Sequence, residues 1–228
     1  MRHWMIFAAA LFALGMSTSA EAGKKNKPPK GDDTEQASED EAEGIVIQET
    51  GVADIDTLFG KAKAPVDTIT NTRLSMEKID ADLVTALGLT EGTPFADALA
   101  DLMAKGEGKI NLAVEDGKAP TFSAEEGIPA NVQASIDALN SGFEELMTVS
   151  AALPQVPDQI MAVVDEAKTF ADVSKLTSMG LKPLEAPKTL KLINANLKAL
   201  GKAPGEVTEL TASLSDMMGT VTSTFKSE

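Results

Sequence analysis

Two adjacent residues near the C-terminal third of the chain have types that could carry out chemistry. Ser174 and Lys175 are the components of a serine–lysine dyad, in which the lysine takes up the serine proton. They are neighbours within a predicted helix, however, and neighbouring helical residues point away from each other. Nothing around Lys175 in the sequence supplies the desolvation that a lysine base requires. We interpret Lys175 as a solvated residue on a helix face and predict no catalytic residues.

Carboxylates are abundant, and oxygen ligands are what calcium prefers. Asp54 and Asp56 match the start of a calcium-binding loop, but Leu58 and Phe59 stand where that loop needs Asp or Asn and then Gly. A second Asp-x-Asp pair at 80–82 fails in the same way. We predict no metal site, with weak divalent binding around a hairpin as the remaining alternative. The carboxylates concerned are Glu115, Asp116, Glu125 and Glu126.

The rarest residue types lie in one short segment at the N-terminus. The chain of 228 residues has no Cys and no Tyr, with one His and one Trp. His3 and Trp4 precede an apolar run from Met5 to Met16, which is the length of a secretory h-region and too short to span a bilayer. Small residues follow, and they allow cleavage after Ala20 or after Ala22. We predict that residues 1–22 are a cleaved signal peptide.

Removal of that segment would leave a mature protein without Cys, His, Trp or Tyr. Catalysis by a Ser-His or Cys-His pair, typical zinc sites, c-type haem attachment and di-iron bundles all need one of these residues. A pair of carboxylates could still hydrolyse a glycoside, but sugar clefts normally use aromatic platforms, and only six Phe would remain. We predict no cofactor and no enzymatic activity. Several methionines lie on apolar stripes, so we interpret most of them as core fillers. A copper(I) site would need clustered methionines, and only Met217 and Met218 are adjacent.

The charge balance bears on partners and compartment. The formal net charge is −15, from 35 acidic and 20 basic residues. Such a surface repels phosphates and anionic lipid headgroups, so we predict no nucleic-acid partner. The basic cluster that stands out is Lys24, Lys25, Lys27 and Lys30. A Cys-free exported chain, with no Cys near the cleavage points to carry a lipid anchor, fits a bacterial periplasm or the extracellular medium.

Residues 23–50 differ in composition from the rest of the chain. A basic stretch with two prolines is followed by an acidic, polar stretch that holds no large apolar residue before Ile45. Such a segment cannot bury enough apolar surface to offset the entropy of ordering its backbone. We predict a disordered charged linker over 23–50, in which Ile45, Val46 and Ile47 alone could pack back on the domain as an extended piece.

From residue 51 onward, apolar residues recur every three or four positions, which is the pattern of helices with one buried face. Gly and Pro punctuate the pattern and divide it into segments. The first segment is either one kinked helix over 52–87 or two helices. The first segment covers 52–87 as one helix, or about 52–61 and 65–87 as two, and the other predicted helices cover about 94–105, 132–153, 157–180, 190–200 and 204–225.

One stretch changes to a period of two. Ile110, Leu112 and Val114 alternate with smaller or polar residues, and a Glu-Asp-Gly-Lys turn sequence follows at 115–118. Pro120 cannot donate to a strand ladder, so the hairpin is expected to be small. We predict a β-hairpin insertion near 109–123.

Together these patterns predict an all-α fold, an antiparallel up-and-down bundle of about five or six helices over 51–228, with no transmembrane span. The apolar stripes along the helices are narrow, so we expect narrow contact surfaces between the helices. The favoured function is an exported non-enzymatic bundle that binds a protein, self-associates through helix faces or acts as a spacer. The alternative is a carrier for a lipid or another apolar ligand in a groove between helices, since the negative charge and the lack of Trp count against helices lying on a membrane. A carboxylate-based enzyme is the least favoured hypothesis.

Overall fold

The computed structural model describes residues 44–115 and 117–226. The predicted signal peptide, residues 1–22, and residues 23–43 of the predicted linker lie outside the described residues. Within the described part, no helix is long and apolar enough to cross a membrane.

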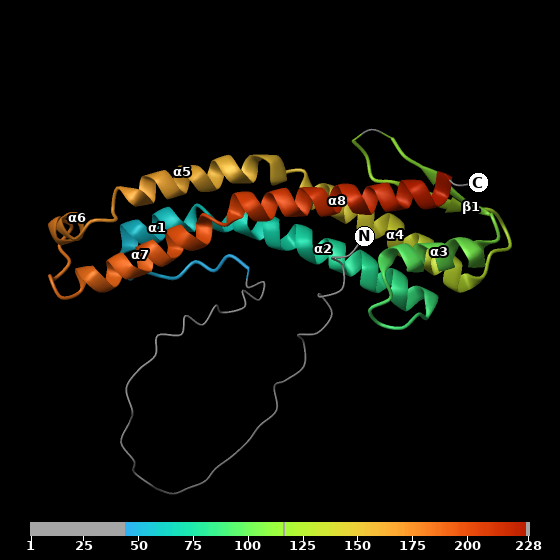
Figure 1. Ribbon diagram of the computed structural model, residues 1–228, viewed down its shortest axis with the longest axis horizontal. Helices are drawn as coiled ribbons and strands as arrows, with labels where there is room; N and C mark the ends of the chain where they lie inside the picture. Colours follow the sequence, from blue (N-terminus) through green and yellow to red (C-terminus); the bar gives the residue numbers. More distant parts are fainter. Residues whose placement is uncertain (1–43, 116, 227–228) are drawn as a thin grey trace, which may run out of the picture. The chain divides into compact units, whose positions relative to one another are not determined.

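The described residues form an all-α bundle with a small antiparallel hairpin, which confirms the predicted fold class (Figure 1). Five helices in this part of the chain have 13 residues or more: α2 (Lys63–Leu87), α4 (Ala130–Ser150), α5 (Val156–Lys168), α7 (Ala186–Leu200) and α8 (Ala203–Lys226). The shorter elements are α1 (Ala53–Gly60), α3 (Phe95–Gly106), α6 (Val173–Ser178) and the 3-10 turn η1 (Leu153–Gln155).

Consecutive helices continue one another and make three rods (Figure 1). The first rod is α1 with α2, the second is α4 with η1 and α5, and the third is α7 with α8. The first and third rods run in one direction and the second runs in the opposite direction, as predicted for an up-and-down bundle. The segment with α3 and the hairpin connects the first rod to the second, and α6 connects the second to the third.

Each rod is interrupted once, at a place that we call its joint: residues 61–62, 151–155 and 201–202. A proline in the first turn begins the helix after every joint: Pro65, Pro157 and Pro204. Proline is tolerated there because the first-turn amides have no helical partner, but it breaks a continuous helix. Residues 52–87 are therefore two helices rather than one kinked helix.

Neighbouring helices cover these joints. α5 packs against both helices of the first rod and both helices of the third rod, so it lies across the joints of each. The joint of the second rod, at η1, packs on α2 and α8. Every joint is thus supported by a helix that is uninterrupted at that place.

The largest helix interface lies between α2 and α4. Gly142 of α4 sits against Ile79 of α2, and a Cβ atom at position 142 would lie 2.6 Å from Ile79 Cγ1. The next residue, Phe143, is fully buried and contacts the rings of Phe95 and Phe122. The close approach at Gly142 therefore allows α4 to seat its aromatic side chain in the core.

The predicted hairpin is present, with β1 (Ile110–Ala113) antiparallel to β2 (Thr121–Ala124) and Ile110 opposite Ala124. Residues 114–120 connect the strands. Within that loop the Lys118 amide donates to the Glu115 carbonyl at 3.1 Å, which closes the turn that the sequence indicates. Phe122 anchors the hairpin, because its ring packs on Phe225 of α8 with centroids 5.2 Å apart.

One helix prediction is wrong. The stripe from Ile160 to Leu176 predicts a single helix that stops near Gly180, whereas α5 ends at Lys168 and α6 begins at Val173. Asp172 has an extended backbone, and its carboxylate accepts a hydrogen bond from the Ser174 amide at 2.6 Å. This side chain caps a new helix at its start. The apolar spacing continued across the break because Leu176 faces the core from α6.

Candidate functional site

The described candidate residues lie on different elements, and Asp116 lies outside the described residues. Ser174 and Lys175 are both exposed on α6. Asp56 is occupied as a structural acceptor, because its carboxylate receives hydrogen bonds from the Thr50 amide at 2.6 Å, the Thr50 hydroxyl at 2.7 Å and the Gly51 amide at 3.1 Å. Glu115 pairs with Lys118 across the hairpin turn. In residues 44–115 and 117–226, no group of three or more acidic, His or Cys side chains is placed to hold a metal ion.

Residues 44–50 form an extended segment, which we call the strap. They belong to the segment that the sequence predicts to be a disordered linker, and here they pack against the bundle. The Gln48 amide donates to Asn196 Oδ1 at 2.8 Å, and Asn196 Nδ2 donates to the Gln48 carbonyl at 2.7 Å. Asn196 lies on α7 and is fully buried. Its carboxamide pairs with the strap backbone as a neighbouring β-strand would, and this pairing fixes a segment of low helical propensity.

A second asparagine holds an extended segment in the same way. The Phe122 amide donates to Asn140 Oδ1 at 2.7 Å, and Asn140 Nδ2 donates to the Phe122 carbonyl at 2.8 Å. Asn140 lies on α4, so both asparagines connect a helical rod to an extended backbone. Sequence reasoning missed both of them. Asn196 could have been found, because it occupies a core position of the α7 stripe, three residues after Ile193 and four before Leu200.

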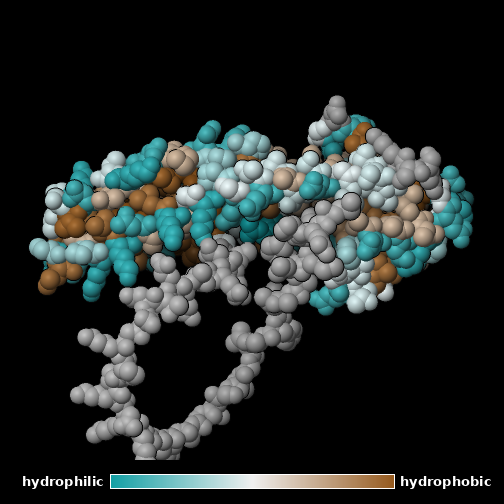
Figure 2. Space-filling model, in the orientation of Figure 1, coloured by the Kyte–Doolittle hydropathy of each residue, from teal (hydrophilic) through white to brown (hydrophobic). Residues whose placement is uncertain are grey.

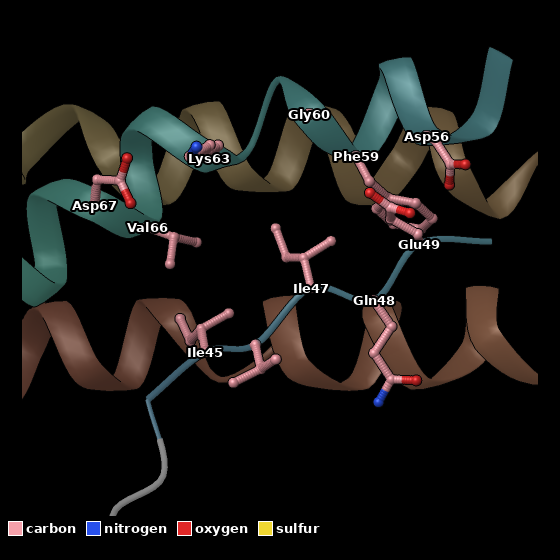
Figure 3. Close-up of a pocket in the computed structure, with 11 residues that line it drawn as sticks. Ile45, Ile47, Gln48, Glu49, Asp56, Phe59, Gly60, Lys63, Val66 and Asp67 are labelled. Atoms are coloured by element: carbon pink, nitrogen blue, oxygen red, sulfur yellow. The ribbon is translucent and has the colours of Figure 1, made fainter. Parts of the chain in front are cut away.

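A pocket of about 520 Å³ lies between the strap and the joint of the first rod (Figure 3). We call it the strap pocket. Phe59, Val66, Ile45 and Ile47 give it apolar walls, and both helix residues are buried. Charged side chains of both signs line it as well: Glu49, Asp56, Lys63 and Asp67. In Figure 3, Ile47 and Val66 extend into the space between the strap and the helices.

Asp80 of α2 is a half-buried carboxylate, one oxygen of which lacks a hydrogen-bond partner. Its Oδ1 atom is inaccessible to solvent and accepts no hydrogen bond. Burial raises the pKa of this carboxyl, because the charged form loses its hydration. Among the described residues, the other group with a shifted pKa is Lys78, an exposed lysine that pairs with Asp82 and Glu145 rather than with Asp80. We therefore interpret Asp80 as a source of instability rather than as a catalytic acid.

Asp80→Asn is expected to raise the free energy of unfolding at neutral pH by about 1 kcal/mol. A raised pKa means that the folded chain binds the Asp80 proton more tightly than the unfolded chain does. The stability that this proton contributes is present below the ordinary pKa of 3.8 and is lost as the pH rises through the raised value. The advantage of the variant over the parent should therefore grow from acid to neutral pH in urea titrations.

Asp82→Asn is the matched control for this prediction. Asp82 lies on the same helix and makes an exposed ion pair with Lys78, with its Oδ2 atom 3.5 Å from Lys78 Nζ. Its loss should lower stability by at most about 0.5 kcal/mol. If Asp80→Asn were less stable than the parent at neutral pH, the unpaired oxygen would not be a burden on the fold.

No model of a known protein family, no curated protein and no solved structure matches this chain. By its geometry, the described part of the chain is an antiparallel helical bundle of three rods, each interrupted at one joint. Two asparagine side chains fasten extended segments to it, and a mixed apolar and charged pocket lies beside one of them.

Proposed function

We propose that the chain is an exported, non-enzymatic helical bundle that binds a protein partner at the strap pocket. The observation that carries this proposal is the composition of the pocket, which has apolar walls and charges of both signs at about 520 Å³. Apolar centres with polar surroundings are the usual anatomy of sites that receive a side chain of a partner protein. Export rests on the apolar run and small residues of segment 1–22.

The contacts of the strap support the proposal of a protein partner, because they are contacts between this bundle and an extended polypeptide segment. Asn196 recognises only the main chain of Gln48, which any extended segment could offer. Side chains of the strap then complete the pocket walls through Ile45 and Ile47. Backbone pairing combined with side-chain pockets is a common way to bind extended peptides.

Site-specific photo-crosslinking in the native compartment tests the proposal. Val46 lines the pocket and is 63% exposed, whereas Leu74 of α2 is 54% exposed and is absent from the pocket lining. A photoreactive residue in place of Val46 should give one discrete protein adduct, and the same residue in place of Leu74 should not.

Gly60→Leu provides a second arm of the experiment, because Gly60 lines the pocket and a Cβ there meets no atom within 4 Å. This substitution should remove the adduct formed from position 46 while leaving the helical circular dichroism unchanged. Adducts of equal yield from positions 46 and 74, or an adduct insensitive to Gly60→Leu, would place the contact elsewhere and contradict the proposal.

The alternative of an apolar-ligand carrier is supported by the pocket volume, which falls in the range of small-ligand sites. Native mass spectrometry of the purified protein separates the two functions. A lipid that co-purifies and is lost in Gly60→Leu would favour the carrier. An enzyme is the least supported function, because the Asp56 carboxylate in the pocket is already engaged by Thr50 and Gly51.

A further inference from the structure

The negative charge of the chain is unevenly distributed. Residues 44–167 contain 21 acidic and 7 basic residues, whereas residues 168–202 contain 7 lysines and 2 acidic residues. The second range is α6, α7 and the segments that flank them. In the sequence only the lysines between 24 and 30 stand out as a cluster, because the lysines of 168–202 are three to seven residues apart and come together only when the chain folds.

Three of these lysines form one surface of α7, which we call the lysine face: Lys188, Lys191 and Lys198. All three are exposed. At 100° per residue they lie on the side of the helix opposite its buried stripe. That stripe consists of Ala186, Thr189, Ile193, Asn196 and Leu200. No acidic residue occurs anywhere in α7.

Ion pairing within the fold does not account for the lysine face. Among the described residues, Lys188, Lys191 and Lys198 make no ion pair, whereas Lys61, Lys78 and Lys105 elsewhere each do. Lys188 lies in the first turn of α7, where the positive end of the helix dipole disfavours a cation. Lys198, by contrast, lies in the last turn, where the dipole favours a cation. Lys188 is thus a cation without an ion pair in an unfavourable place, which indicates that its charge serves an external anion.

An exposed apolar side chain lies in the segment that joins α6 to α7, where Leu184 is 87% exposed. Val173, at the start of α6, is 39% exposed. Leu184 stands between Lys182 and Lys188 in the sequence. Figure 2 shows apolar and hydrophilic residues side by side over this α6–α7 end of the bundle. The surface therefore offers a row of cations beside a protruding leucine.

We propose that the lysine face, together with Leu184, attaches the bundle to the surface of a bilayer that contains anionic phospholipids. Lysines with long flexible stems suit the mobile phosphates of such a surface, and an exposed leucine can enter the headgroup layer. Specific protein interfaces are instead depleted of Lys, whereas all the charged residues of this face are lysines.

The overall charge does not oppose this attachment. At physiological ionic strength, exposed charges more than about 8 Å from the membrane contact are largely screened. The charges within reach of the headgroups are those of α6 and α7, where lysines dominate. The expectation from net charge that this chain avoids anionic lipid therefore does not hold for this face. The attachment is independent of the strap pocket, since no residue of the lysine face lines it.

Vesicle flotation with the full chain tests the proposal. We expect binding to phosphatidylcholine vesicles that contain about 30 mol% phosphatidylglycerol, weak binding to pure phosphatidylcholine, and loss of binding near 0.5 M salt. The variant Lys188→Gln/Lys191→Gln/Lys198→Gln should bind the anionic vesicles about 100-fold more weakly. Leu184→Ser should weaken binding about tenfold.

The matched control is Lys61→Gln/Lys78→Gln/Lys118→Gln, which removes the same charge from exposed lysines in other parts of the chain. It should change affinity by less than about threefold. All variants share residues 1–43, so any binding by the apolar run of that segment is common to them. Three results would overturn the assignment. One is equal binding to neutral and anionic vesicles, and another is an equal loss of vesicle binding in both triple variants while their circular dichroism is unchanged. The third is binding of the chain to an acidic protein but not to vesicles.

Discussion

Asn196→Leu is expected to lower the free energy of unfolding by about 2–3 kcal/mol. Leucine has nearly the same shape as asparagine but cannot accept from the Gln48 amide or donate to the Gln48 carbonyl, whose bonds are 2.8 Å and 2.7 Å long. Both backbone groups then lose their partner, and the strap must leave α7 to regain water. Urea unfolding measures the loss, and hydrogen exchange of the Gln48 amide reports whether the strap has been released.

Asn194→Leu is the matched control, because Asn194 lies two residues earlier on α7 and is exposed. It should change stability by no more than about 0.5 kcal/mol. If Asn196→Leu behaved like this control, burial of the leucine would compensate fully and the carboxamide would not be what fastens the strap. Asn140→Leu repeats the experiment at the hairpin, where the protected amide is that of Phe122.

Gly142→Ala is expected to cost about 1–3 kcal/mol, even though alanine favours helices more than glycine does. The new Cβ would lie 2.6 Å from Ile79 Cγ1, and Ile79 is buried in the interface between α2 and α4. Either the two helices separate or Ile79 leaves its rotamer. Thermal and urea unfolding should both record the loss.

Gly219→Ala in α8 should have the opposite sign, with a gain of about 1 kcal/mol, because a Cβ there meets no atom within 4 Å. A double-mutant cycle sharpens the test. Ile79→Ala removes the atom that meets the new methyl group, so Gly142→Ala should cost less in that background than in the parent. Additive costs would show that the close approach at Gly142 does not limit helix packing.

The local features of this fold were predictable because short stretches of sequence determine them. Gly88 has a left-handed backbone with φ 68° and ends α2, as a glycine after an apolar stripe indicates. The alternation at Ile110 and Leu112 gave the strand, and Pro65 marked the start of a helix. Each of these signals acts within a few residues of its consequence.

The features missed by sequence analysis depend on contacts between distant residues. The strap is fixed by Asn196, which is 148 residues from Gln48. Lys188 and Lys198 belong to one surface only because α7 is a helix whose other side is buried. Asp172 caps the start of α6 after α5 has ended at Lys168, although the apolar spacing continues through it. Position in three dimensions, rather than residue type, gives these side chains their roles.

The contacts of α5 with both helices of the first and third rods have a mechanical consequence. A helix interrupted by two residues is compliant at the interruption, but either joint can bend only by sliding its two helices against α5. The resistance to bending at each joint therefore comes from the packed side chains between the rod and α5, which would have to slide past one another. Loss of α5, by proteolysis or local melting, would leave both joints free to bend. The first and third rods would then become flexible at the same time.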